Sequence, residues 1–427
     1  MKISVKKIDF RPFRAWRYNP AKVGLDQVIA PPYDVISPTE RDALYEKSPY
    51  NVVRLILGRE PNFYEQARQC WENWSREGVL VQDDRPAYYL YQQSFRHPGD
   101  SRPLVRRALV GILHLDSAGS VLPHEATFSA PKKDRFLLLE KTKTNLSPVF
   151  GLYQDAKGSM EKLLSSLQKA TPSFEARDPE GVTHEVWKIE AEPLQKTIRE
   201  VLSSKKILIA DGHHRFETAQ EYRRQRRGHG GGGEMPFDFV MMALVADEDQ
   251  GLVVLPTHRV VRSLGNQAPA EFLRKLKENF EFSAVKEEEL ISRLSKAPPE
   301  KIVFGASLGP AENFLLTLKS LDTLRSVLPS GKPPVWFRVE ANLLGHFVFD
   351  GLWGLSSKER EGLVEYTRSV EEALRKVHEG KAAAAFFLRP TRVDTIRELA
   401  DTGERMPQKT TYFYPKLASG LFFYHHG

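Results

Sequence analysis

The sequence predicts a mixed α/β (α+β) protein with more than one lobe. Short apolar runs rich in β-branched residues, typical of strands, alternate along the chain with stretches whose apolar residues recur at helical spacing. Hydrophobic residues make up 41% of the chain, as in folded globular proteins. The 427 residues are many for a single hydrophobic core, so we expect two or three lobes.

The expected elements fall into three segments. Residues 1–105 are predicted to form an N-terminal mixed α/β segment. Residues 106–265 are predicted to form the core of the protein. Residues 266–427 are predicted to form a C-terminal α/β lobe that contributes to the substrate site.

The first segment illustrates how single elements are assigned. Residues 51–57 (NVVRLIL) and 87–95 (AYYLYQQSF) are predicted strands, with a helix over 62–78 between them. A short helix is expected after Ser37, which would be its N-cap, with Pro38 at the first helical position.

Composition excludes several classes of protein. There is no run of eighteen apolar residues and no signal-peptide pattern, so we expect a soluble, cytoplasmic protein. A single cysteine, Cys70, excludes an intrachain disulfide and any multi-cysteine metal site. The formal charge of +7 suits anionic ligands, but it is too small for this length to argue for nucleic acid.

The stretch 205–224 (KKILIADGHHRFETAQEYRR) carries the most informative pattern. Its run ILIA suits a buried strand, and apolar residues recur at helical spacing after Asp211 and Gly212. A strand is therefore expected to turn tightly into a helix. The start of a helix presents unpaired backbone N–H groups and the positive end of the helix dipole, and Gly212 has no side chain to keep a ligand away from them.

Two interpretations of this turn are open. In the first, Asp211 is an ordinary N-cap, and His213, His214 and Arg215 are solvated residues of the first helical turn. In the second, the turn binds a phosphate. The first turn of a helix normally favours acidic residues, and a cationic one opposes the helix dipole unless a negative charge lies between them. We therefore favour the phosphate site.

Residues 122–135 (LPHEATFSAPKKDR) contain a second candidate, Glu125, in a stretch expected to be loop-like. The small and apolar residues around it would partly desolvate its carboxylate. Desolvation would raise the pKa of Glu125 and suit it to work as a general base. Lys132 and Lys133 are expected to belong to a solvated charge run.

Residues 403–417 (GERMPQKTTYFYPKL) combine Lys409, Thr410 and Thr411 with aromatic residues and two prolines. The alternation in TTYFYP is typical of an edge strand, which alone would explain the stretch. The two threonines and the lysine are equally suited to hold a small carboxylate or phosphate.

Several familiar signatures are absent from the sequence, among them the P-loop, the G-x-G-x-x-G turn and H-E-x-x-H. Residues 305–309 (GASLG) match the G-x-S-x-G elbow of hydrolases, but Pro310 and a strand-like stretch follow instead of a helix. We therefore expect a hairpin turn there and no nucleophilic role for Ser307. Four glycines at 230–233 are expected to form a loop that moves or closes over a ligand.

Three separated stretches resemble the archaeal free L-serine kinases: 210–215 (ADGHHR), 123–125 (PHE) and 390–415. Those enzymes have a ParB/sulfiredoxin-like fold and phosphorylate the hydroxyl of serine. The chain as a whole, with APPYDVIS, DGHHRFETA and MPQKTTYFYPKL, is similar to a widespread bacterial and archaeal family labelled only as a domain of unknown function. The resemblance implies a ParB/sulfiredoxin-like nucleotide-binding core over 106–265, with additional mixed α/β lobes around it.

The resemblance also implies roles for single residues. Glu125 matches the catalytic glutamate that takes the proton from the substrate hydroxyl, and Asp211 matches an acid of the active-site turn that acts on Mg²⁺ or on the hydroxyl. His213 is the third catalytic candidate. The phosphate-binding turn is matched by Gly212, His213, His214 and Arg215, and the expected substrate contacts are His124, Lys409, Thr410 and Thr411.

The implied function is that of a nucleotide-dependent small-molecule kinase, with Mg²⁺ as cofactor, ATP or ADP as phosphoryl donor and free L-serine as the first candidate acceptor. A ParB-like nucleotide-binding regulator that associates with DNA is the alternative, although the sequence has no convincing helix-turn-helix pattern. A metal-dependent hydrolase built on His213 and His214 is a third possibility. Adjacent residues on a helix point about a hundred degrees apart, so such a pair rarely chelates one ion.

Overall fold

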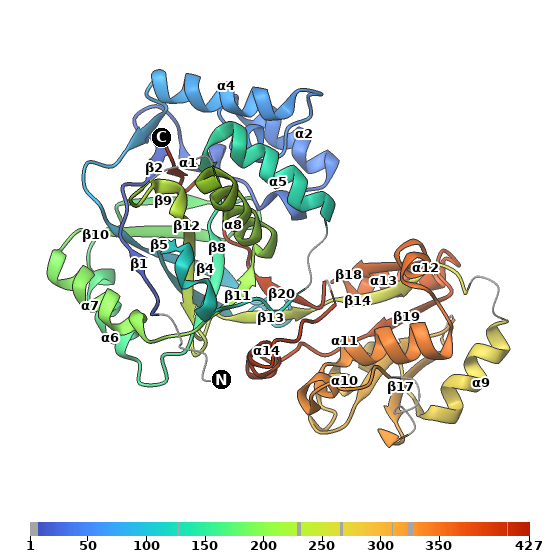
Figure 1. Ribbon diagram of the computed structural model, residues 1–427. Coiled ribbons are helices and arrows are strands. Elements are labelled where there is room, and N and C mark those ends of the chain that lie inside the picture. The colour runs from blue at the N-terminus through green and yellow to red at the C-terminus, as the bar shows by residue number, and fades with distance from the viewer. Residues whose placement is uncertain are drawn as a thin grey trace. The chain divides into compact units, whose positions relative to one another are not determined.

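The computed structural model describes residues 7–125, 129–228, 232–264, 268–309, 311–322, 328–407 and 409–427, and it confirms the mixed α/β class (Figure 1). Contact density divides the chain into two compact units. The first unit comprises Met1–Pro123, Thr127–Val253 and Phe413–Gly427. The second unit comprises His124–Ala126 and Val254–Tyr412.

This division differs from the three segments expected from the sequence. Residues 1–105 and 106–265 share one sheet, because β4 (Tyr88–Arg96) pairs with both β5 (Pro103–His114) and β10 (Thr183–Ile189). Residues 413–427 return to the first unit instead of staying with the C-terminal lobe. Strand pairing between distant parts of the chain therefore decides the grouping.

Among the described residues, a nine-stranded sheet forms the centre of the first unit. Its main path runs β6-β11-β8-β12-β5-β4-β10-β9, and β1 pairs with β5 beside this path. The pairs β11–β6 and β12–β8 are parallel and the others antiparallel. The remaining strands of this sheet are β1 (Phe10–Arg11), β6 (Val121–Leu122), β8 (Val149–Tyr153), β9 (Phe174–Arg177), β11 (Ile207–Asp211) and β12 (Phe239–Ala246).

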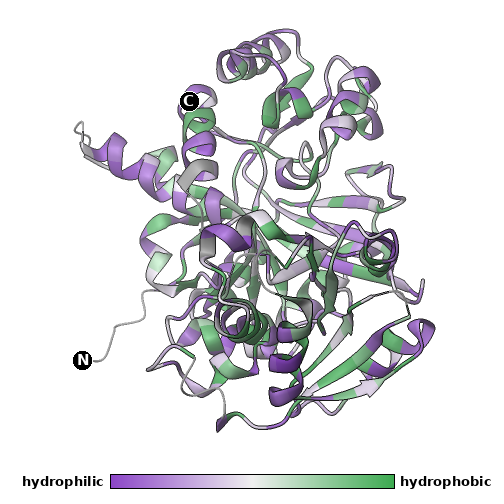
Figure 2. Cartoon of the chain, turned by 90° about the vertical axis from the view of Figure 1, so that its right-hand side faces the viewer, coloured by the Kyte–Doolittle hydropathy of each residue, from purple (hydrophilic) through white to green (hydrophobic). Residues whose placement is uncertain are grey.

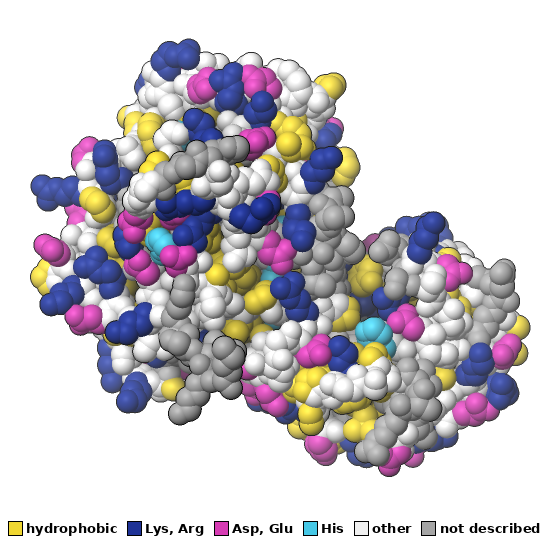
Figure 3. Space-filling model, in the orientation of Figure 1, with side chains coloured by type: hydrophobic (Ala, Val, Ile, Leu, Met, Phe, Trp, Pro, Cys, Tyr) yellow, Lys and Arg dark blue, Asp and Glu magenta, His cyan; other side chains and the backbone are white. Residues whose placement is uncertain are grey.

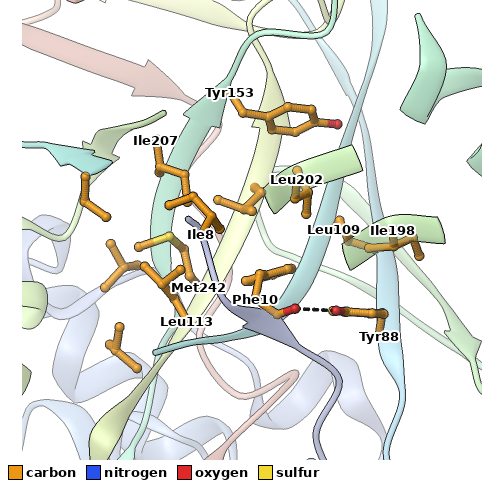
Figure 4. Packing of buried hydrophobic residues seen from close by; sticks show 14 of the residues in the cluster. Ile8, Phe10, Tyr88, Leu109, Leu113, Tyr153, Ile198, Leu202, Ile207 and Met242 are labelled. Atoms are coloured by element: carbon orange, nitrogen blue, oxygen red, sulfur yellow. Dashed lines mark hydrogen bonds between the residues drawn. The ribbon is translucent and has the colours of Figure 1, made fainter. Parts of the chain in front are cut away.

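A hydrophobic core joins this sheet to three helices, α6 (Ser159–Ser165), α7 (Glu192–Ser203) and α8 (His213–Gly228). Figure 4 shows side chains of α7 packed against side chains of the strands. The hydroxyl of Tyr88, inside this core, donates a hydrogen bond to the Phe10 carbonyl at 2.6 Å. Burial of each large apolar side chain of this kind contributes about 1.5–3 kcal/mol to folding.

The N-terminal helices form a second hydrophobic cluster of the first unit, together with Phe423 from the C-terminal segment. The expected helix after Ser37 is confirmed, with a capping box in which Ser37 and Glu40 exchange hydrogen bonds. The helix predicted over 62–78 is confirmed as α4. The helices are α1 (Leu25–Val28), α2 (Pro38–Lys47), α3 (Val53–Ile56), α4 (Phe63–Arg76) and α5 (Ser129–Thr142).

The strand predicted over 51–57 is wrong, because this stretch contains the short helix α3. The Asn51 side chain accepts from the Val53 N–H at 3.0 Å and donates to the Gln27 carbonyl at 2.8 Å, which stabilises a turn at this point. The apolar run reflects burial inside the helical cluster rather than pairing in a sheet.

The second unit contains a six-stranded antiparallel sheet in the order β15-β17-β16-β19-β14-β18, counted over the described residues. The expected hairpin after 305–309 is confirmed, since β16 and β17 pair directly and Ser307 is fully buried. The strands are β14 (His258–Val261), β15 (Phe280–Ala284), β16 (Val303–Ser307), β17 (Asn313–Leu318), β18 (Val364–Thr367) and β19 (Ala384–Phe387).

Helices of the chain carry both hydrophilic and hydrophobic residues (Figure 2). The second unit has its own set of helices. They are α9 (Pro269–Asn279), α10 (Glu287–Ser295), α11 (Glu340–Leu343), α12 (Ser357–Leu363), α13 (Val370–His378) and α14 (Val393–Asp401). After α11 the chain continues as the π-helical stretch η7 (Leu344–Leu352). Small two-stranded sheets pair β2 (Trp16–Tyr18) with β3 (Leu80–Gln82), β7 (Thr144–Asn145) with β21 (Tyr424–His425), and β13 (Val253–Pro256) with β20 (Thr411–Tyr414).

Within the described parts of the chain, the helices lack the combination of length and apolar character needed to cross a membrane. Lys and Arg side chains are interspersed with Asp and Glu side chains over the face seen in Figure 3. Two of the four glycines predicted to move or close over a ligand, at 230 and 231, lie outside the described residues.

Candidate active site

The predicted turn from strand to helix is confirmed at the end of β11, in the first unit, because α8 begins at His213. The pairing of β11 with β8 shifts its register at this end: Ile209 lies opposite Gly151, but Asp211 lies opposite Phe150. Such a β-bulge bends a strand and re-aims the side chain that follows it. The bulge therefore sets the direction of the Asp211 side chain at the start of the turn.

Gly212 is required by the geometry of this turn. Its φ angle is +88°, which lies in the left-handed region that side-chain-bearing residues rarely adopt. A Cβ atom at this position would also lie 2.9 Å from Nη2 of Arg215. The guanidinium of Arg215 thus packs against the bare Cα of Gly212, a contact that the sequence did not predict.

The carboxylate of Asp211 is held between two cations. Its Oδ1 lies 2.5 Å from Nζ of Lys416, and its Oδ2 lies 2.7 Å from Nη2 of Arg215. All three side chains are mostly buried, with 16%, 10% and 15% of their surface exposed for Asp211, Lys416 and Arg215. Burial alone would raise the pKa of Asp211, but the charges of Lys416 and Arg215 outweigh it and lower that pKa to about 2.

Lys416 is the site residue that sequence reasoning missed. Buried polar side chains of β4 and β5 hold its backbone: Gln93 donates to the Lys416 carbonyl at 3.0 Å, and Arg106 donates to the Tyr414 carbonyl at 3.1 Å and to the Pro415 carbonyl. Arg106 is 1% exposed, and burial lowers its pKa to about 10. The only signal in the sequence was that Lys416 belongs to the unusual stretch 403–417.

Arg215 has protein partners, so it is not the solvated residue of the first interpretation of the turn. Its Nη1 donates to the Pro148 carbonyl, and its Nη2 donates to Asp211. Arg215 therefore also fixes the segment before β8 relative to the turn. A phosphate would add to these contacts, since a guanidinium carries five N–H donors.

The two histidines of the turn differ in exposure. His213 is buried, with 8% of its surface exposed, whereas His214 is half-buried. Burial lowers the pKa of His214, although the neighbouring Glu217 opposes this effect. Glu217 also pairs with Lys132 at 3.1 Å, and Lys132 lies on α5, so the stretch after residue 128 is helical and not the expected loop.

The residues present do not fit Asp211 as a ligand of Mg²⁺. Both of its carboxylate oxygens already bind cationic side chains. Among the described residues, no group of three or more His, Cys, Asp or Glu side chains is arranged to hold one metal ion. A divalent cation on Asp211 would be repelled by the charges of Lys416 and Arg215.

Glu125 belongs to the second unit. It forms a parallel bridge with Met406, and its Oε1 accepts a hydrogen bond from the backbone N–H of Lys409 at 2.7 Å. Lys409 has a φ angle of +56°, which is uncommon for a residue with a side chain. The structure therefore brings Glu125 and the KTT stretch together, as their roles in the predicted substrate site require.

The other predicted substrate residues are partly structural. His124 is completely buried, and its Nε2 lies 3.0 Å from the hydroxyl of Thr411. Thr410 is 4% exposed and donates to the Pro407 carbonyl at 2.6 Å. His124 and Thr410 thus position the chain around Glu125, whereas Lys409 is exposed and Thr411 half-buried.

A family model described as "Protein of unknown function (DUF1015)" matches residues 10–340. The chain belongs to the DUF1015 family. No curated protein matches it. The stretch 403–417, which contributes to the family resemblance seen in the sequence, lies outside the matched residues 10–340.

Solved structures resemble this DUF1015 chain at low identity. A conserved hypothetical protein from Pyrococcus furiosus is 14% identical, with a TM-score of 0.36 over 73% of this chain and 93% of that chain. A free serine kinase variant in complex with ADP is 14% identical, with a TM-score of 0.37 over 73% and 91%. SbnI with a C-terminal truncation, from Staphylococcus aureus, is 10% identical, with a TM-score of 0.35 over 73% and 85%. At this level of likeness nothing about ligands or activity transfers to the DUF1015 chain.

Proposed function

We propose that this DUF1015 protein is a nucleotide-dependent kinase that phosphorylates the hydroxyl of a small molecule, with free L-serine as the first candidate acceptor. One observation carries the proposal: Arg215 and Lys416 share the single carboxylate of Asp211 at the start of α8. The two cations exceed the charge of that carboxylate by one, and all three side chains are mostly buried.

An anion at this turn would gain charge-assisted contacts with Arg215 and Lys416 in a mostly buried site, where such contacts are strong. The anion also gains the backbone N–H groups and the dipole at the start of α8, a helix of 16 residues. Phosphate is the biological anion that this combination suits best. The proposed ligand of the turn is therefore the phosphate chain of ATP or ADP.

Phosphoryl transfer depends on positioning and on neutralising oxygen charge more than on covalent chemistry by the protein. Arg215 and Lys416 supply the neutralising charge in this proposal. Mg²⁺ is expected to arrive with the nucleotide, since in such sites phosphate oxygens provide much of its coordination.

Glu125 is the proposed general base, the role that its match to the catalytic glutamate of the free serine kinases implies. Its carboxylate is 19% exposed, and one oxygen is anchored by the Lys409 N–H, so its orientation is fixed within the second unit. In the proposed reaction Glu125 accepts the proton of the acceptor hydroxyl, whose oxygen forms the new bond to the terminal phosphorus as the bond to the departing nucleotide breaks.

The activity itself is tested by incubating the protein with Mg²⁺, L-serine and either ATP or ADP. Phosphorus NMR should show O-phosphoserine together with ADP from ATP, or AMP from ADP. Nucleotide binding without phosphorylation of any small alcohol would contradict the kinase proposal. Salt-sensitive DNA binding under the same conditions would favour the regulator instead.

The role of Glu125 is tested with Glu125→Gln, which keeps the size of the side chain and removes its capacity to accept a proton. Turnover should fall roughly 10²–10⁴-fold while nucleotide affinity stays constant, because a general base acts only as the transition state forms. Glu300→Gln, at an exposed position of the same unit, is the matched control. Equal turnover in the two variants would remove Glu125 from the mechanism.

A further inference from the structure

Three cationic side chains of the second unit lie against two tyrosine rings, and we call this group the cation–tyrosine cluster. The Arg259 guanidinium lies 4.6 Å from the centre of the Tyr366 ring, and Lys409 Nζ lies 5.5 Å from the centre of the same ring. The Arg368 guanidinium lies 3.9 Å from the centre of the Tyr412 ring.

The sheet of the second unit positions the buried part of this cluster. Arg259 on β14 is directly opposite Tyr366 on the neighbouring strand β18. Arg259 is only 4% exposed and donates to the Thr257 carbonyl, whereas Tyr366 is 38% exposed. The exposed ring of Tyr366 thus lies against a buried cation at the edge of the sheet.

The three cations have no carboxylate partner of their own among the described residues. Within the described residues, Arg259, Arg368 and Lys409 form no ion pair closer than 4 Å, although other arginines of this unit do, such as Arg389 with Glu340. Burial lowers the pKa of Arg259 to about 10, and Glu125 is among the charged groups that oppose this effect. Glu125 thus acts electrostatically on Arg259, the buried cation of the cluster.

We propose that the cation–tyrosine cluster binds the carboxylate of the acceptor, so that the acceptors of this protein are small hydroxy acids. This inference rests on the proposed kinase function and names its substrate class. A guanidinium stacked on an aromatic ring still presents its N–H edge, which matches a carboxylate in a bidentate geometry. Alcohols without a carboxylate lack an anionic group that these cations could bind.

Lys409 connects the cluster to Glu125, the proposed general base. Its side chain belongs to the cluster, and its backbone N–H donates to Oε1 of Glu125. An acid held by the Lys409 ammonium thus lies beside the candidate base. Because the cluster is cationic overall, it also favours a hydroxy acid without an ammonium group over the zwitterion L-serine.

The test measures equilibrium binding to the full chain by calorimetry, with and without ADP. The probes are glycerate, L-serine and ethanolamine, which share a primary hydroxyl and differ in carrying a carboxylate, both charged groups, or an ammonium alone. Glycerate should bind most tightly, and ethanolamine at least tenfold more weakly than L-serine. Failure of both acids to bind, or equal binding of ethanolamine and L-serine, would overturn the inference.

Arg368→Gln is the variant of choice because Arg368 is exposed and its loss should not affect folding. It should weaken glycerate binding about tenfold or more, since it removes a charge-assisted contact, and leave ADP binding unchanged. Arg375→Gln, at an exposed position of α13, should change neither. Unchanged glycerate binding in both Arg368→Gln and Arg259→Lys would overturn the inference. It would also be overturned if these variants lost affinity for ADP and kept their affinity for glycerate.

Binding and turnover separate the two proposals. If the acids bind through the cluster but no phosphoryl group is transferred, the kinase proposal fails and the acid-binding site stands. If a phosphoryl group is transferred to ethanolamine as readily as to glycerate, the kinase proposal stands and the inference about the acceptor fails.

Discussion

Nζ of Lys416 lies 2.5 Å from Oδ1 of Asp211, although the two residues are 205 positions apart in the chain. Asp211 ends β11 of the first unit, and Lys416 belongs to the C-terminal segment that Gln93 and Arg106 hold against the same sheet. The charge of the candidate phosphate site is therefore set by a residue outside the DGHHR motif.

Lys416→Met should weaken nucleotide binding about thirtyfold, because a charge-assisted contact in a mostly buried site contributes about 2 kcal/mol. Calorimetric titration with ADP measures the change. Lys157→Met, at an exposed position of the same unit, should leave the affinity unaltered. Equal affinities in the two variants would mean that Lys416 only holds Asp211.

Gly212→Ala should destabilise the protein by about 1–2 kcal/mol, because the new side chain would occupy the left-handed region at a φ of +88°. It should also weaken nucleotide binding, since the added Cβ would displace the Arg215 guanidinium. Gly228→Ala, in the same helix, meets no atom within 4 Å and should be neutral or slightly stabilising. Thermal unfolding and ADP titration compare the two variants, and a Gly212→Ala protein that behaves like Gly228→Ala would refute the packing role of Gly212.

Arg215→Lys keeps the positive charge but loses the fork that reaches both Pro148 and Asp211. We expect a loss of stability together with a weaker affinity for nucleotide, whereas a purely ligand-binding arginine would affect affinity alone. Chemical denaturation and ADP titration of the same preparation measure both effects. Unchanged stability would show that the contact with the Pro148 carbonyl contributes little.

His258 should make the stability of the second unit depend on pH. Burial, aided by the neighbouring Arg259, lowers the pKa of His258 from the ordinary 6.5 to about 4. Between these values the unfolded chain binds a proton that the folded chain does not. The contribution of neutral His258 is therefore complete above pH 6.5 and is lost as the pH falls towards 4, at about 1.4 kcal/mol per pH unit.

The measurement is chemical denaturation at pH 7 and at pH 5, followed for the wild type and for His258→Gln. The wild type should lose about 2 kcal/mol more than the variant between these two pH values. His97→Gln replaces a less buried histidine of the first unit and serves as the control. A variant with the same pH dependence as the wild type would show that His258 titrates normally.

Local patterns were enough to predict the strand, the turn and the helix of 205–224. The apolar spacing of β11 and α8 is a property of neighbouring residues, and Gly212 is a local requirement of the turn. The same reasoning predicted the capped helix after Ser37 and the hairpin after 305–309. It failed at 51–57, where burial on all sides produced a strand-like apolar run in a short helix.

The sequence by itself determined which residue types are available at the turn, and it singled out Glu125 and the KTT stretch as further candidates. Only the tertiary structure decided that Asp211 is shared by Arg215 and Lys416, and that Arg259, Arg368 and Lys409 gather around two tyrosines. These arrangements depend on strand register and on the return of a distant segment to a sheet. Strand register and the return of this segment are determined by hydrogen bonds and burial between residues far apart in the chain. The periodicity of a single stretch does not reveal such contacts.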